Sequence, residues 1–173
     1  MQATTDTQEL IGDVNNFTGN SKWSTISDTG VVIWSQDIGK NYVNICYPIP
    51  TGVHVYLTRE LTSSNGKLSG FQYWIGTSVG AYDIDIINVP LDDYFIETCI
   101  DEIDLTKYSE NYENVYVSIV LVVVAYNSVK YTYTSIAFNS MELKPEYSYI
   151  LKANEQLGIE KVGFMYCSEY TKK

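Results

Sequence analysis

The sequence predicts an all-β protein: an antiparallel β-sandwich with jelly-roll or Greek-key connections and a short N-terminal arm. From residue 23 onward the chain is a succession of short runs in which apolar and polar residues alternate, broken by turn residues. The 16 tyrosines suit the half-buried surface of a sheet. No helical segments alternate with the strands, which argues against a parallel β-α-β arrangement.

Composition divides the chain into two parts. Residues 1–22 are rich in Thr, Asp and Asn and contain one apolar cluster, Leu10, Ile11 and Val14, so we expect an arm that docks on a neighbouring subunit. Residues 23–173 have the length of one domain with its own core. The N-terminus lacks the basic and apolar regions of a signal peptide, which predicts synthesis in a reducing cytoplasm, followed either by retention there or by transport from it inside a particle.

About nine to eleven strands are expected. Asn65-Gly66 and Asn127-Ser128 are hairpin turn signals, and residues 104–114 are expected to form a loop with one turn of helix. In residues 81–89 the alternation predicts Tyr82, Ile84 and Ile86 inward. The expected strands are residues 31–35, 41–47, 53–61, 71–76, 81–89, 115–126, 129–138, 147–153 and 159–167.

The strand over residues 115–126 is apolar on both faces. One face carries Val117, Ile119, Leu121 and Val123, and the other carries Val120, Val122 and Val124. In a two-layer sandwich the outer face meets water, and leaving the three valines bare forgoes about 1.5–3 kcal/mol of burial each.

Two kinds of cover would hide these valines. The N-terminal arm or residues 100–114 could fold over them, or a second subunit could cover them. We expect the second, a homo-oligomer whose interface joins the valine stripe to the neighbouring tyrosine-rich strand. The predicted interface residues are Val120, Val122, Val124, Tyr131, Tyr133, Leu10 and Ile11.

Charge excludes two classes of partner. The net charge is −10, with a single arginine, Arg59, among scattered lysines. Nucleic-acid binding needs clustered basic residues, and an anionic membrane repels an acidic chain, so neither is an expected partner.

The three cysteines, Cys46, Cys99 and Cys167, form no CxxC pattern and no even disulfide set. Each sits in an apolar stretch, and buried reduced thiols are expected. The single histidine, His54, has no dyad partner nearby in sequence and is expected at the surface. With no nucleophile–base pair, metal triad or phosphate loop, we predict that the protein is not an enzyme and needs no cofactor.

The stretch "LDDYFIETCIDEID", residues 91–104, concentrates carboxylates. A solvated acidic rim is the first interpretation. A structural Ca²⁺ held by Asp101, Glu102 and Asp104 is the alternative, and a pair of glycosidase carboxylates is the third.

The stretch "GFQYWIG", residues 70–76, offers an aromatic platform for a sugar, with Gln72, Tyr73 and Trp74 as candidate ligand-binding residues. Because neighbouring residues of a strand face opposite sides, one of Tyr73 and Trp74 must point outward. A tryptophan in the core is the competing interpretation.

The alternation pattern of residues 23–167 resembles that of two groups of jelly-roll sandwiches. The stretches that carry the resemblance are "GFQYWIG", "YENVYVSIVLVVV" and "MELKPEYSYILKA". The two groups are accessory virion proteins of tailed phages (decoration or head-fibre-like) and carbohydrate-binding modules. The resemblance implies a non-enzymatic virion component, assembled in the host cytoplasm and binding itself and other virion proteins. The alternatives are a glycan- or surface-binding module and a cytoplasmic enzyme without a recognisable motif.

Overall fold

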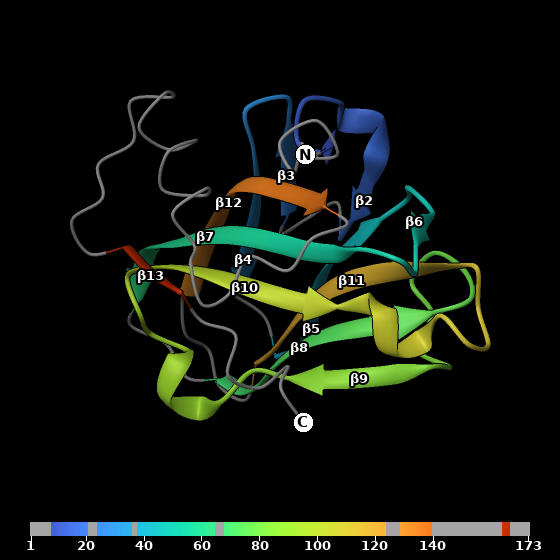
Figure 1. Cartoon of the computed structure of the whole chain (residues 1–173). Coiled ribbons are helices and arrows are strands. Elements are labelled where there is room, and N and C mark those ends of the chain that lie inside the picture. Colours follow the sequence, from blue (N-terminus) through green and yellow to red (C-terminus); the bar gives the residue numbers. More distant parts are fainter. Residues whose placement is uncertain are drawn as a thin grey trace.

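The computed structural model describes residues 8–20, 24–35, 38–64, 68–123, 129–139 and 164–166. Within these residues the chain forms two sheets that pack face to face, and the predicted antiparallel β-sandwich is confirmed (Figure 1). The parallel pairing of β10 with β13 departs from the otherwise antiparallel pattern. No helix of the described part is long and apolar enough to span a membrane.

The seven-stranded sheet has the order β13-β10-β7-β12-β4-β3, with β1 paired to β12. Its strands are β1 (Gln8–Glu9), β3 (Ser24–Ser27), β4 (Gly30–Ser35), β7 (His54–Ser64), β10 (Thr98–Asp104), β12 (Val129–Asn139) and β13 (Phe164–Tyr166).

The six-stranded sheet has the order β2-β5-β11-β8-β9, with β6 paired to β11. Its strands are β2 (Phe17–Gly19), β5 (Gly39–Ile45), β6 (Ile49–Pro50), β8 (Leu68–Gly76), β9 (Asp85–Asn88) and β11 (Asn114–Val123). Three short 3-10 helices lie between strands: η2 (Val14–Asn16), η3 (Leu91–Asp93) and η4 (Leu105–Tyr108), the last as expected for residues 104–114.

The chain changes sheet at most of its connections, which corrects both predicted hairpins. β7 and β8 flank the Asn65-Gly66 signal but belong to different sheets, and so do β11 and β12 on either side of Asn127-Ser128. Local turn chemistry permits a hairpin, whereas the choice of sheet depends on distant strands. β11 is therefore flanked by β5 and β8, and β12 by β4 and β7.

The core lies between the sheets and takes the inward side chains of both. The predicted inward face of β11 is found there, with Val117, Ile119 and Leu121 fully buried in the main apolar cluster. In β9 the alternation runs opposite to the prediction. Ile87 enters the core, while Ile86 is exposed. Before the strand, Tyr82 is exposed, whereas Ile84 packs against the core as predicted.

The N-terminal segment is part of the sandwich over residues 8–20. β1 pairs with β12 in one sheet and β2 pairs with β5 in the other. Leu10 and Ile11, predicted to dock on a neighbour, are buried in the chain's own core together with Phe17. Glu9 strengthens this attachment, because its carboxylate accepts from the backbone N–H of Ile136 at 2.9 Å.

Candidate functional site

The outer face of the six-stranded sheet gathers polar and aromatic side chains. Strand register puts Tyr42 and Asn44 of β5, Ser118 of β11, and Gln72 and Trp74 of β8 on this face. The inward neighbours of these residues lie in the core, so this side of each strand faces away from the sandwich.

A pocket of about 240 Å³ opens on this face and is lined by Tyr42, Asn44, Trp74 and Gly80. It offers an indole, a phenol and a carboxamide, which is a combination of apolar ring surface and hydrogen-bonding groups. Binding sites for small molecules have this composition: mostly apolar walls with a few placed polar groups.

Trp74 is held in place by its neighbours. Its indole N–H donates to Gln72 Oε1 at 2.9 Å, and Gln72 Nε2 donates to Asn88 Oδ1 at 3.0 Å. Tyr82 packs against the indole with ring centroids 4.4 Å apart, and the Lys40 ammonium lies 4.9 Å from the indole centroid. Pre-positioning a ring in this way lowers the entropy lost when a ligand binds.

Ser118 lies between the two sides of the pocket, directly opposite Asn44 on one strand and Trp74 on the other. It is small and only 1% exposed, and its hydroxyl has no hydrogen-bond partner among the described residues. Buried hydroxyl groups are normally satisfied, so the unpaired hydroxyl of Ser118 is an exception that lies next to the pocket.

The loop between β8 and β9 forms one wall. Thr77 donates to Asp83 twice, from its backbone N–H at 2.8 Å and from its hydroxyl at 2.6 Å. These hydrogen bonds from Thr77 lower the pKa of Asp83. Gly80 has a φ of +82°, a conformation that glycine adopts without strain, and it brings bare backbone against the Asn44 amide.

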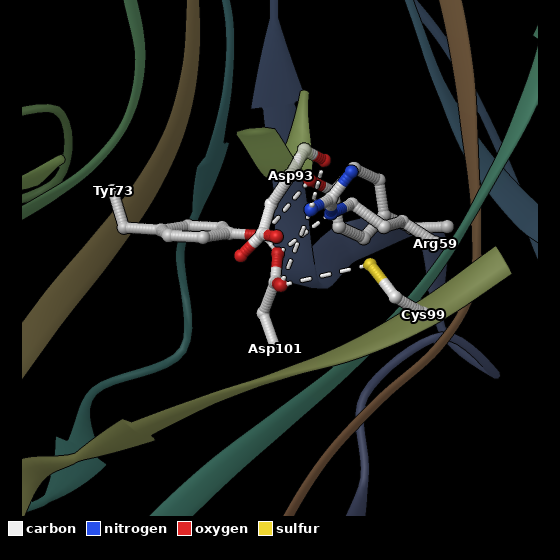
Figure 2. A network of polar contacts seen from close by, with 6 residues as sticks. Arg59, Tyr73, Asp93, Cys99 and Asp101 are labelled. Carbon is white, nitrogen blue, oxygen red and sulfur yellow. Dashed lines mark hydrogen bonds and ion pairs between the residues drawn. The ribbon is translucent and has the colours of Figure 1, made fainter. Parts of the chain in front are cut away.

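A second polar cluster lies inside the core and links the sheets (Figure 2). Arg59 of β7 donates through Nε to Asp101 of β10 at 2.7 Å and through a terminal nitrogen to the carbonyl of Asp93 at 3.1 Å. Tyr73 of β8 reaches Asp101 from the other side and donates its hydroxyl to the same carboxylate. The hydroxyls of Tyr73 and Tyr133 are 3.0 Å apart.

Burial sets the protonation of this cluster. Arg59 and Asp101 are both 0% exposed. Desolvation alone would lower the pKa of Arg59, but the facing carboxylate of Asp101 together with Cys99, Tyr73 and Tyr133 outweighs it, and the pKa of Arg59 lies above its usual value. Burial raises the pKa of Tyr133; Arg59 opposes this rise and Asp101 adds to it. With no access for a ligand, we interpret the cluster as structural.

Because side chains alternate along β8, the three predicted sugar-binding residues do not all lie on the same face of the sheet. Trp74 and Gln72 lie together on the outer face beside the pocket, whereas Tyr73 is fully buried in the core. Tyr73 is therefore corrected from a ligand contact to a member of the buried cluster.

The residues of the predicted subunit interface do not lie together on one surface. Tyr131 and Tyr133 point into the core, since β12 presents Thr132 rather than the tyrosines on its outer face. Val120 and Val122 lie on the other sheet, Val120 fully buried and Val122 half-buried. Val124 lies outside the described residues.

The predicted calcium ligands also diverge. Asp101 and Glu102 are adjacent in a strand and so face opposite sides, and Asp101 is paired with Arg59. Asp104 caps η4, accepting from the Thr106 N–H at 2.9 Å. Among the residues that the structure describes, no group of three or more His, Cys, Asp or Glu side chains is placed to hold a metal ion.

His54 and the three cysteines are the remaining residues whose burial the sequence predicts. His54 is buried, not at the surface, and its Nδ1 lies 2.9 Å from Glu102 Oε2 and 3.7 Å from Asp104. Cys99 is buried and Cys46 half-buried, both as free thiols. Cys167 lies outside the described residues.

Sequence reasoning missed Tyr42, Asn44, Gly80 and Ser118 of the pocket. A signal was available for Tyr42 and Asn44, because they share the polar parity of the strand over residues 41–47. Their proximity to Trp74 depends on β11 pairing with both β5 and β8, and nothing local encodes this order.

Comparisons with known proteins add little to this description. No protein-family model and no curated protein matches the chain. Among solved structures, the glycoside hydrolase domain of Endo-D from Streptococcus pneumoniae R6 is similar, with a TM-score of 0.46 and 9% identity over 75% of this chain. The match spans 22% of that protein's chain, and a likeness at this level carries no argument about function.

Proposed function

We propose that the protein is a non-enzymatic glycan-binding β-sandwich, and that it binds a sugar in the pocket formed by Tyr42, Asn44, Trp74 and Gly80. The observation that carries the proposal is the pairing of a fixed indole with amide and hydroxyl groups in one small hollow. A pyranose has an apolar ring face and a rim of hydroxyls, and this hollow complements both.

The size of the hollow suits one sugar residue. Its volume of about 240 Å³ is below the range of roughly 300–1,000 Å³ that is typical of sites for drug-sized ligands. We therefore assign it to a terminal residue or a side branch of a glycan rather than to several residues of a chain.

The pocket residues support binding without catalysis. Glycoside hydrolysis needs two carboxyl groups on either side of the scissile bond. The described residues that line this pocket are two aromatic side chains, an amide and a glycine, and none of them carries a carboxyl group. The virion role expected from the sequence stays a prediction, since no contact in the structure bears on it.

A glycan array tests the proposal with wild type and four variants. We expect wild type to retain a defined set of glycans, and we expect Trp74→Ala and Asn44→Ala to lose at least about fivefold in affinity, because one aromatic contact and one hydrogen bond are each worth about 1 kcal/mol or more. The matched control is Trp34→Ala, which removes a tryptophan that is 36% exposed on the other sheet.

Melting curves accompany the array, so that a misfolded variant is recognised. Ser118→Val places a larger side chain that suits a strand between Asn44 and Trp74, and by displacing these two pocket residues it should weaken retention while the protein stays folded. The proposal fails if wild type retains no glycan, or if the pocket variants bind as wild type does.

A further inference from the structure

The outer face of the six-stranded sheet is unusually free of negative charge for this protein. The chain holds 21 acidic residues against 11 basic ones. Yet the strands of this sheet direct no carboxylate outward within the described residues; Asp85 of β9 pairs with inward-facing Ile75 and accepts from the Tyr108 hydroxyl at 2.6 Å. The outward residues are Thr18, Lys40, Tyr42, Asn44, Gly70, Gln72, Trp74, Ile86, Asn88, Tyr116, Ser118, Val120 and Val122.

Lys40 is the one charged residue of this set, and it stands beside the pocket. Its ammonium lies 4.9 Å from the indole centroid of Trp74 and 5.7 Å from the ring centroid of Tyr82. The side chain is exposed, and it forms no ion pair within the described part of the chain. An unpaired ammonium at the edge of an aromatic pocket can accept a negatively charged ligand group without losing a salt bridge.

The overall charge of −10 does not oppose such a ligand at this position. At physiological ionic strength, exposed charges separated by more than about 8 Å are largely screened from one another. The field at the pocket is therefore set by the charges close to it, and among the outward residues of the strands the charge beside the pocket is the Lys40 ammonium, 4.9 Å from the Trp74 ring.

We infer that the pocket selects sugars that carry an anionic substituent, a carboxylate or a sulfate, with Lys40 as the residue that recognises the anion. The sugar ring contacts Trp74 and Tyr42, and the substituent contacts the ammonium of Lys40. This inference rests on the proposed function, since it names the class of sugar that the same pocket takes.

The first experiment compares glycans that bear uronic acid, sialic acid or sulfate with neutral glycans on the array. We expect the retained glycans to be anionic, and the carboxylated and sulfated members distinguish the two sources of charge. Reduction of the uronic carboxyl groups to alcohols, on otherwise identical glycans, should weaken binding by about threefold or more, as for a partly exposed ion pair.

Two variants of the face isolate the charge. Lys40→Gln removes the ammonium, and Val122→Asp places a carboxylate directly opposite Lys40 in the sheet, where it can pair with it. Both should abolish the preference for anionic over neutral sugars. Lys130→Gln is the matched control, because Lys130 lies 5.5 Å above the Trp34 ring on the other sheet.

Titration of wild type with glucuronic acid and with glucose, followed by NMR at 0.05 and 0.5 M NaCl, completes the test. A preference for glucuronic acid that shrinks at high salt supports the inference. Equal binding of both sugars, unchanged in Lys40→Gln, overturns it and leaves the proposed function standing. If no sugar binds here or on the array, both are rejected.

Discussion

At the scale of single residues, the most consequential contact is the buried pair of Arg59 and Asp101. Both side chains are 0% exposed, and the carboxylate also accepts from Tyr73 across the core. Replacing a well-packed buried pair as a whole is often tolerated, whereas removal of one partner strands the other charge in a medium of low polarity.

We therefore expect Arg59→Met to lower the free energy of unfolding by about 3–5 kcal/mol, as measured by urea denaturation. The double variant Arg59→Met/Asp101→Leu removes the stranded charge and should recover part of the loss. A single variant as stable as wild type, or a double variant less stable than the single one, would contradict this account.

The buried tyrosines predict a loss of stability at high pH. Burial raises the pKa of Tyr133 above the ordinary value of 10.0. The folded protein then holds this proton more tightly than the unfolded chain does. Stability is full below about pH 10 and falls as the pH rises further, by at most about 1.4 kcal/mol per pH unit for each such group.

Melting temperatures between pH 8 and 12 should follow this decline, and the part of the tyrosinate absorbance that comes from the buried tyrosines should appear only as the protein unfolds. Tyr133→Phe removes one contributor, so its curve should fall less steeply than that of wild type above pH 10. Parallel curves for the two proteins would show that Tyr133 does not couple its ionisation to folding.

Much of the residue-level core could be predicted from alternation alone, but the buried charges could not. Arg59 occupies the same parity as Val55 and Leu57, and Asp101 the same parity as Ile103. Opposite charges on the apolar parity of two strands are a usable signal for an internal ion pair. Whether those strands are neighbours is decided by the pairing of β7 with β10, which is a property of the whole sheet.

At the scale of elements, the strands were predictable and their partners were not. Period-two alternation located most of the strands, because it reflects one local fact, that a strand buries every second residue. Hairpin signals failed at both connections described above, because a favourable turn sequence does not oblige the flanking strands to pair. The pocket could not be predicted from the sequence for the same reason, since it is built from three strands whose order only the fold determines.

The N-terminal segment has a different role in the structure from the docking role predicted from its composition. β1 and β2 tie it to both sheets, and Leu10 fills part of the core at 0% exposure. We expect Leu10→Ala to cost about 2–5 kcal/mol of stability in chemical denaturation, the usual cost of truncating a buried leucine. Val14→Ala is the control, because Val14 is 43% exposed and its truncation should cost less than about 0.5 kcal/mol.

Two other results for these variants would contradict a core role of this segment. If Leu10→Ala is as stable as wild type but assembles less well, residues 8–20 act as the docking arm that their composition suggested. If both variants lose stability equally, the truncation acts through the unfolded chain and not through the core.

At the scale of the whole molecule, the two outer faces of the sandwich differ in character. On the outer face of the seven-stranded sheet, His54 and Glu102 are buried against each other, with His54 Nδ1 2.9 Å from Glu102 Oε2. The strands of the six-stranded sheet carry the pocket and, within the described residues, direct Lys40 outward as their only charged side chain. The proposed function places recognition on the face of the six-stranded sheet.

The residues predicted to form the homo-oligomer interface offer little exposed apolar surface. Leu10, Ile11, Val120, Tyr131 and Tyr133 are each at most 4% exposed within a single chain. Side chains that one chain already buries add no apolar area to a contact with a second chain. Of the valine stripe, only half-buried Val122 is partly accessible within the described residues.

We therefore expect Val122→Asp to leave both the fold and the native mass of the protein unchanged. The new carboxylate lies opposite Lys40, so it gains a partner at the surface and is not an uncompensated buried charge. Native mass spectrometry and a melting curve check this, with Ile119→Asp as the control, because Ile119 is fully buried and an unpaired charge there should unfold the protein. A drop in mass from oligomer to folded monomer in Val122→Asp would restore the valine stripe as a subunit contact and would require the pocket face to be occluded in the assembly.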